Sequence, residues 1–119
     1  MATVYTNVGI AKVVDIIDGT ATAPAWYIAW ATGAGTATAT STTLFNEAAE
    51  SRVIATLSQP TADKNQFVAT MTAAGNKTIT NAGIFDNTVG GNLLIHGDFS
   101  GVALLTDDQI KFTFTLQQT

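Results

Sequence analysis

The chain has 119 residues, enough for one domain with its own core, and only 12% of them are charged. Five basic and nine acidic side chains give a net charge of -4 at pH 7, which disfavours a nucleic-acid partner. The absence of cysteine excludes disulfides, thiolate metal sites and cysteine nucleophiles. A single histidine excludes a multi-histidine metal site within one chain.

Eight short strands are predicted in chain order from apolar alternation and turn signals. They are 8–17, 25–31, 52–59, 67–73, 77–86, 93–99, 102–105 and 110–117. The last is the most regular, with Ile110, Phe112, Phe114 and Leu116 pointing inward. This spacing predicts an all-β fold class: a single-domain antiparallel β-sandwich over residues 1–119, jelly-roll-like, with one short helix.

The segments between the strands carry three further expectations. The N-terminal residues are expected to form an extended arm, and the small uncharged residues at 33–43 a flexible loop. Thr43 is expected to cap a helix of at most two turns within 42–50. Gly83, inside a predicted strand, indicates a bulge or a close backbone contact.

Threonine and alanine, 21 and 19 residues, make up a third of the chain. Threonine favours strands, where its hydroxyl can face water. A hydroxyl surface is cheaper to desolvate than a charged one, which suits a protein packed against other proteins. No basic region precedes an apolar run at the N-terminus, and prolines and glycines interrupt the uncharged stretch 19–46. We therefore expect neither a signal peptide nor a membrane span.

The best catalytic candidate is His96, with Asp98 and Ser100 two and four residues further along the same strand face. Neighbours at this spacing lie about 6 to 7 Å apart. That distance is too long for the contacts of a serine–histidine–aspartate unit. His96 is therefore interpreted as a surface histidine on a polar strand face.

The remaining polar candidates are Asp107 with Asp108, Asp15 with Asp18, Glu47 with Glu50, and Gly33-Ala34-Gly35-Thr36. Aspartates at turns usually cap their own backbone, and a calcium site needs more oxygen ligands than one such pair supplies. The two glutamates are interpreted as solvated charges on a short exposed helix, with Arg52 nearby. The glycine-rich loop lacks the lysine and the following helix of a phosphate-binding loop. No catalytic, cofactor-binding or metal residue is assigned, and no enzyme activity is expected.

The aromatic strand 25–31 raises the question of a binding face. Trp26, Ile28 and Trp30 share one side, which is assigned to the core, and Tyr27 lies on the other, which is assigned to an interface. The alternative is a carbohydrate-binding module that uses Tyr27 or an exposed tryptophan.

Several segments together resemble small all-β virion structural proteins of tailed bacteriophages. They are WYIAWATG at 26–33, TTLFNE at 42–47 followed by Arg52-Val53, KTITNAGIFD at 77–86, GNLLIHGDF at 91–99 and the closing FTFTL at 112–116. The resemblance implies a capsid decoration, cement or staple protein, and no site residue is carried over from it.

The expected function is a non-enzymatic capsid decoration protein that binds the outer head surface and stabilises capsomer contacts. A tail, baseplate or fibre component is the alternative. The expected partners are the major capsid protein or tail proteins, together with further copies of the chain in a dimer or trimer, without nucleic acid or membrane. The expected location is the outer capsid surface of the virion, after synthesis in the host cytoplasm.

Overall fold

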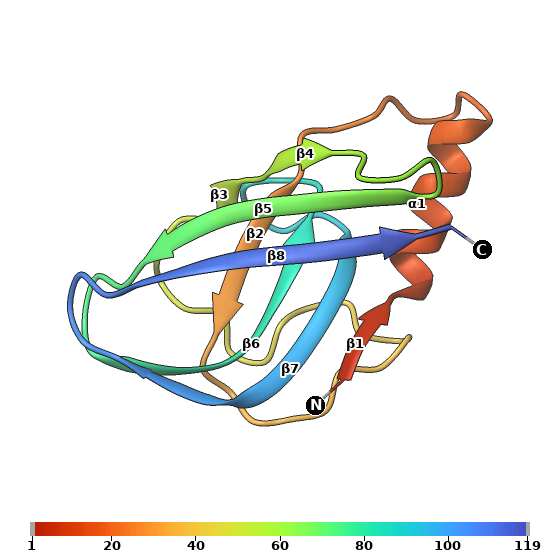
Figure 1. The fold of residues 1–119 in the computed structure, drawn as a ribbon. Coiled ribbons are helices and arrows are strands. Elements are labelled where there is room, and N and C mark those ends of the chain that lie inside the picture. Colours follow the sequence, from red (N-terminus) through yellow and green to blue (C-terminus); the bar gives the residue numbers. More distant parts are fainter. Residues whose placement is uncertain (1, 119) are drawn as a thin grey trace.

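The computed structural model of the chain describes residues 2–118. Its elements are β1 (Ala2–Tyr5), α1 (Asn7–Ile17), β2 (Tyr27–Ala31), β3 (Val53–Ile54), β4 (Thr56–Ser58), β5 (Lys64–Thr72), β6 (Lys77–Phe85), β7 (Leu93–Leu104) and β8 (Gln109–Gln117). The strands form two antiparallel sheets, and the helix lies at one end of them (Figure 1). The predicted class, an all-β sandwich with one short helix, is confirmed.

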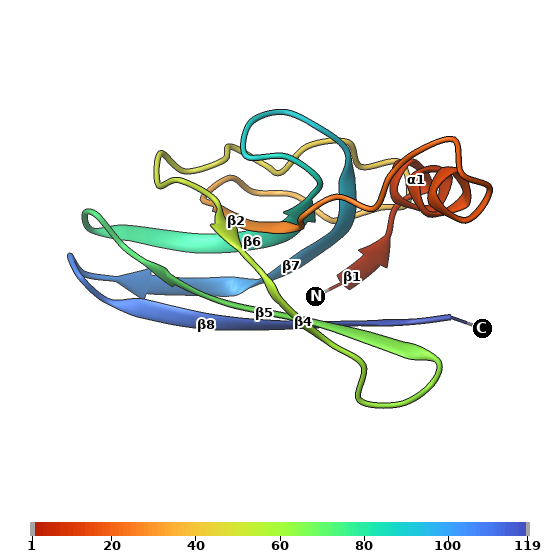
Figure 2. The ribbon, with the colours of Figure 1, turned by 90° about the horizontal axis from the view of Figure 1, so that it is seen from above.

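The two sheets face each other across a shared apolar core (Figure 2). One sheet has five strands in the order β1-β7-β6-β2-β3, and the other has three in the order β4-β5-β8. Trp30 from the larger sheet and Met71 from the smaller are among the largest fully buried side chains of this core. Within the described residues, no helix has the length and apolar character needed to cross a membrane.

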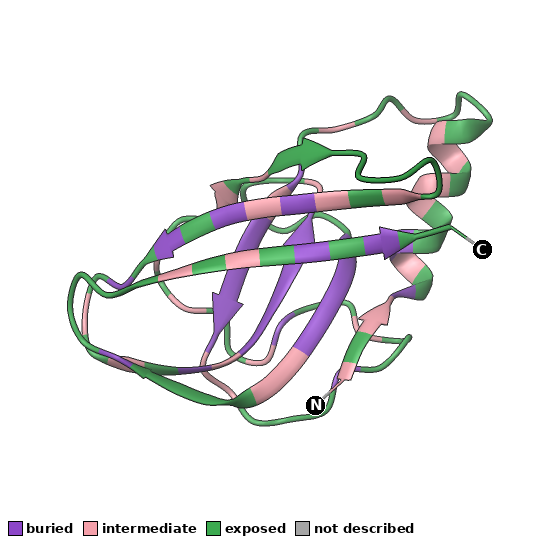
Figure 3. Ribbon diagram, viewed as in Figure 1, coloured by how far each residue is buried: buried purple, intermediate pink, exposed green. Residues whose placement is uncertain are grey.

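Strand β8 has the alternation that its sequence predicts. Phe114 and Leu116 are buried, Ile110 and Phe112 pack against the core from partly buried positions, and the residues between them are exposed (Figure 3). The smaller sheet therefore has one face on the core and one face toward solvent.

The larger sheet is covered on both faces. A second apolar cluster, formed by Ala29, Ala31, Leu44, Phe85 and Leu93, lies apart from the main core. Leu44 reaches this cluster from the long segment between β2 and β3. Gly83 of β6 lies beneath the same segment, since an added Cβ would come within 2.8 Å of Leu44 and 2.6 Å of the Ile95 carbonyl oxygen. The predicted close backbone contact at Gly83 is confirmed.

Residues 8–17 form a helix, so the predicted strand there is wrong. Thr6 is the N-cap, and its Oγ1 accepts a hydrogen bond from Gly9 N at 2.9 Å. Gly9 lets the helix approach β7, because a Cβ there would lie 2.6 Å from Leu94 O. Val13 and Ile16 pack against the core one helical turn apart, so tertiary packing outweighs the strand preference of β-branched residues.

No helix forms within 42–50, contrary to the prediction. Asn46 has a left-handed φ of 59°, which interrupts any helical turn, and Glu47 forms an isolated bridge with Ala31. Phe45 N donates to the Asn81 side chain at 3.0 Å, and Thr43 is not a helix N-cap, because no helix follows it in this described segment. Backbone groups of this segment therefore bond to strands β2 and β6.

Two strand boundaries also differ from the prediction. The expected strand 52–59 is divided at Ala55, where the chain passes from the larger sheet to the smaller one. The expected strands 93–99 and 102–105 are one strand, β7, with an irregular register opposite Ile79 to Asn81. The N-terminal residues, expected as an arm, form β1 and pair with β7.

Candidate functional site

His96, the best catalytic candidate, lies beneath the segment 33–46. Its side chain is 0% exposed, its ring is 4.7 Å from the Phe45 ring, and its Nε2 is 3.1 Å from Asn81 Oδ1. The interpretation as a surface histidine is wrong, because the long segment covers this face of the sheet. Burial lowers the pKa of His96 below its usual value, and the nearby charge of Asp98 opposes this effect.

Asp98 holds backbone segments together. Its carboxylate accepts hydrogen bonds from Ala37 N at 2.7 Å and from Ala2 N at 3.2 Å, and the bond from Ala37 lowers the pKa of Asp98. Ser100 is exposed, within the irregular part of β7. Among the described residues, the imidazole of His96 therefore bonds to Asn81 rather than to Asp98 or Ser100, and the arrangement for nucleophilic catalysis is not formed.

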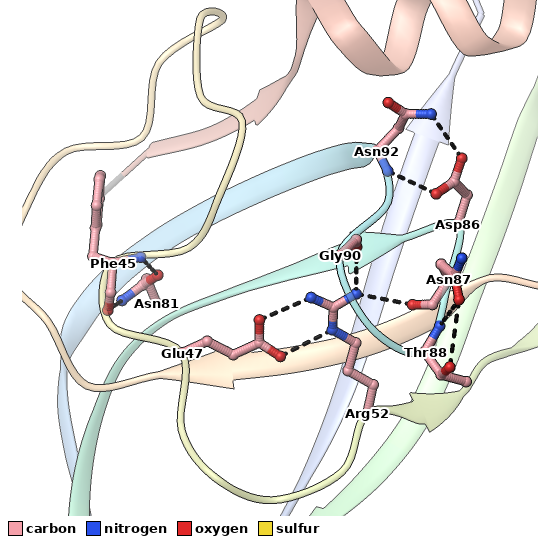
Figure 4. Close-up of polar contacts among 9 residues, drawn as sticks. All are labelled: Phe45, Glu47, Arg52, Asn81, Asp86, Asn87, Thr88, Gly90 and Asn92. Atoms are coloured by element: carbon pink, nitrogen blue, oxygen red, sulfur yellow. Dashed lines mark hydrogen bonds and ion pairs between the residues drawn. The ribbon is translucent and has the colours of Figure 1, made fainter.

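Arg52 is the centre of a dense polar cluster (Figure 4). Its guanidinium forms a two-pronged ion pair with Glu47, with both N–O distances 2.9 Å, and it donates to the carbonyls of Asn87 and Gly90 at 2.9 and 2.8 Å. Its Cζ also lies 3.7 Å from the centre of the Phe85 ring. One side chain thus joins the segment before β3 to the loop between β6 and β7.

The same loop is closed at its base by Asp86. The carboxylate accepts from Asn92 N at 2.7 Å and from Asn92 Nδ2 at 3.0 Å (Figure 4), and Lys12 of α1 lies 3.5 Å away. Gly90 and Gly91 supply the positive φ angles of the turn. The loop presents Val89, which is 81% exposed, beside a hollow of about 640 Å³. These contacts hold residues 86–92 in place, and exposed Val89 lies at the end of the loop. We call this segment the braced tip.

The two glutamates were interpreted as solvated charges on a short exposed helix, and this interpretation is wrong. Glu47 is paired with Arg52, and Glu50 accepts from the Lys77 ammonium, from Ala74 N at 2.9 Å and from Trp30 Nε1 at 3.1 Å. Burial alone would raise the pKa of Glu50, but these hydrogen bonds outweigh it and lower the pKa to about 2. Glu50 is therefore a buried anchor for its segment.

The turn aspartates cap their backbone, as interpreted from the sequence. Asp108 Oδ2 accepts from Leu105 N at 2.8 Å, and Asp18 Oδ1 accepts from Thr20 N at 2.9 Å. Among residues 2–118, no three histidine, cysteine or acidic side chains cluster in a way that could hold a metal ion. The Gly33 to Thr36 loop runs into no helix, and the carbonyl of Gly33 accepts from Thr80 and Asn81.

Both tryptophans are core residues, as predicted. Trp26 is 9% exposed and Trp30 is 0% exposed, while Tyr27 is half-buried. Because neither indole faces solvent, a carbohydrate-binding module would have to rely on Tyr27 alone.

The sandwich has an open side between β7 and β8. A groove of about 530 Å³ runs there, lined by Thr3, residues 97–100, Val102, Ile110 and residues 112–115. Phe99, Phe112 and Phe114 form a row of aromatic rings, with successive centroids 6.4 and 6.1 Å apart. The groove and the braced tip were not predicted from the sequence, although the inward orientation of Phe112 and Phe114 on β8 was.

The described residues form a β module whose buried polar groups hold backbone segments in place and whose open features are strand edges and a loop tip. In class, the module is an all-β antiparallel sandwich. Residues 5–117 match the family of the podophage GP4 fiber I protein gp80, and the chain belongs to this family. It is therefore a virion structural protein of a bacteriophage. No curated protein matches the chain.

Proposed function

We propose that the chain is a non-enzymatic structural component of a phage fibre. The observation that carries this proposal is the family match, which covers nearly the whole chain and whose description refers to a fibre protein. The alternative expected from the sequence, a tail or fibre component, is thereby favoured over capsid decoration.

The contacts described above support a structural role. Arg52, Glu50 and Asp98 each use their charge to hold backbone or another side chain of the fold. The braced tip at 86–92 and the free strand edges are left as surfaces for contact with other virion proteins.

Immunogold labelling of purified virions with an antibody against this chain tests the proposal. Gold confined to the fibres is the expected result. Gold spread evenly over the heads would overturn the fibre assignment in favour of capsid decoration. Antibody preabsorbed with the purified chain is the control, and gold that persists with it counts as nonspecific.

A further inference from the structure

Residues 33–46 lie across the face of the larger sheet that is turned away from the main core (Figure 2), and we call this segment the strap. Its two ends are joined to each other, since Gly33 N donates to Phe45 O at 2.7 Å. Within the strap, all of which the structure describes, only Ala37 and Leu44 are buried, and no residue is charged. The strap is therefore attached to the sheet by a few contacts and has no core of its own.

Two side chains of the larger sheet hold the strap. Asn81 Oδ1 accepts from Phe45 N at 3.0 Å (Figure 4), and Asn81 Nδ2 donates to the carbonyls of Gly33 and Phe45, both at 3.3 Å. Asp98 Oδ2 accepts from Ala37 N, in the middle of the strap, at 2.7 Å. Two further hydrogen bonds run from the Thr80 hydroxyl to Gly33 O and from Asn7 N to Ala39 O. Asn81 at the ends and Asp98 in the middle therefore make the main polar contacts between the strap and the sheet.

His96 is coupled to both of these side chains. Its Nε2 lies 3.1 Å from Asn81 Oδ1, the same atom that accepts from Phe45 N. The negative charge of Asp98, two residues further along the same strand, favours a proton on the imidazole. His96 is fully buried, and its ring lies 4.7 Å from the Phe45 ring. A change in the charge of His96 therefore acts directly on the two groups that hold the strap.

Among the described residues, Asp98 is the charge that acts on His96. The strand partners of His96 are Val4 of β1 and Gly83 of β6, and neither is ionisable. Helix α1 approaches β7 where Gly9 meets Leu94. The other ionisable groups of the elements packed against β7 lie elsewhere: Tyr5 is opposite Ile95, Lys77 is bound to Glu50, Lys12 is bound to Asp86, and Asp15 follows Lys12 on α1.

Protonation of His96 is incompatible with the closed strap. The proton would be added at Nδ1, which is buried with no hydrogen-bond partner among the described residues. A buried cation with an unpaired donor is costly. The Phe45 ring can offset a part of this cost by contact with the imidazolium, but it offers no acceptor to Nδ1. If the Asp98 carboxylate turned toward Nδ1 instead, it would leave Ala37 N, and the middle of the strap would be released.

We propose that the strap is a pH-dependent cover: protonation of His96 releases residues 33–46 from the larger sheet while the two sheets of the sandwich stay together. Release uncovers the second apolar cluster, because Leu44 of the strap then leaves Phe85 and Leu93. The main core, on the other face of the larger sheet, keeps its contacts. Acid thus converts a covered face of the sheet into an exposed apolar surface. The inference does not depend on where in the virion the chain lies.

The direction of the response follows from burial. In the closed state burial lowers the pKa of His96, whereas in the open state the ring meets water and has its usual pKa of about 6.5. As the pH falls through about 6.5, the open state binds a proton before the closed state does. The equilibrium therefore shifts toward the open strap by up to about tenfold per pH unit, until the closed-state pKa is reached.

Hydrogen exchange at pH 6.5 and 5.5 tests the proposal, with each rate divided by the intrinsic exchange rate at that pH. Protection of the Ala37 and Phe45 amides, which bond to Asp98 and Asn81, is expected to fall by up to about tenfold. Protection in β5 and β8 is expected to change by less than about twofold, because these strands pair in the other sheet. Asp98 stays ionised over this range, since the hydrogen bond from Ala37 lowers its pKa.

The titration of His96 can be followed without ambiguity, because it is the only histidine of the chain. Its imidazole resonance in NMR spectra is expected to titrate over the same pH range as the loss of strap protection. H96Q is the matched variant: its amide nitrogen can still donate to Asn81, but it takes up no proton, so its strap protection is expected to stay constant from pH 6.5 to 5.5. If H96Q does not fold, the agreement of the two curves in the parent protein still decides.

Constant strap protection in the parent protein would overturn the proposal. So would an equal loss of protection in β5 and β8, because acid would then unfold the whole domain rather than release the strap. A parent-like response in H96Q, or strap opening at a pH where His96 does not titrate, would assign the response to another group and also overturn it.

Discussion

Nε2 of His96 donates to Oδ1 of Asn81, an atom that also accepts the backbone N–H of Phe45. The amide nitrogen of Asn81 points the other way, toward the carbonyls of Gly33 and Phe45, so its oxygen acts only as an acceptor. The imidazole must therefore carry its proton on Nε2. Its Nδ1 is buried without a hydrogen-bond partner among the described residues.

Acidification below neutral pH should destabilise the protein through His96. Burial lowers the pKa of His96 in the folded state, so the unfolded chain binds a proton first as the pH falls through about 6.5. The free energy of unfolding then decreases with falling pH until the folded-state pKa is reached. Urea denaturation at several pH values between 7.5 and 5 measures how steeply the free energy of unfolding changes with pH.

H96Q is the control for that experiment, because His96 is the only histidine of the chain. The variant should lose stability at neutral pH but show a flatter pH dependence between 7.5 and 5. Equal slopes in the parent and the variant would show that His96 does not titrate with folding.

Replacing Glu50 by glutamine should destabilise the fold by about 1–3 kcal/mol, because the partly buried ammonium of Lys77 loses its counter-charge. E47Q is the matched comparison. Glu47 is more exposed, and its pair with Arg52 is expected to be worth about 1 kcal/mol or less. Thermal or urea denaturation of both variants measures the difference, and an equal loss would contradict the anchoring role of Glu50.

The pH dependence of Glu50 has a defined direction. Since its folded-state pKa is lowered to about 2 from 4.5, its stabilisation is complete above pH 4.5 and is lost as the pH falls toward 2. The parent should therefore lose more stability than E50Q between pH 5 and 2.5. If the free energies of unfolding of the parent and of E50Q fell in parallel over this pH range, the stabilising role of the Glu50 carboxylate would be contradicted.

Substitution of Gly83 by alanine should cost about 1–3 kcal/mol, because the added Cβ would meet the backbone oxygen of Ile95 at 2.6 Å. Gly75 is the matched control. A Cβ there meets nothing within 4 Å, so G75A should be neutral or slightly stabilising. A G83A protein as stable as G75A would show that β6 and β7 can separate at little cost.

Arg52→Lys should loosen the tip at 86–92 while preserving the positive charge. A lysine ammonium cannot reproduce the planar fork that contacts Glu47 together with the carbonyls of Asn87 and Gly90. Hydrogen exchange should become faster for amides 87–91 and stay unchanged in β5. Unchanged exchange in the tip would show that the hydrogen bonds of Asp86 suffice to hold it.

Local patterns predicted the strands whose two faces differ. β8 was identified because one face meets the core and the other meets water, and β5 was identified for the same reason. Helix α1 was missed because its valines and isoleucines favour a strand by themselves. Its N-cap Thr6 and the close approach of Gly9 to Leu94 are informative only once β7 is in place.

The candidate site was less predictable, because each of its parts joins residues distant in sequence. His96 is buried by a segment about fifty residues before it, and Arg52 reaches carbonyls 35 and 38 residues away. Periodicity along one strand carries no information about such a cover. The braced tip had one visible signal, the Gly90-Gly91 turn, which indicated a change of direction without indicating what held it.

The pairing of β1 with β7 sets an order of events during folding. Ala2 and Asp98 are 96 residues apart, yet they are bonded to each other in the finished sheet. Strand β1 therefore cannot pair until β7 has been synthesised, when most of the chain has left the ribosome. Until then the apolar surface of α1 has no sheet to pack against. Such long-range closure slows folding, because the entropy of closing the long loop is lost before the contacts of β1 are gained.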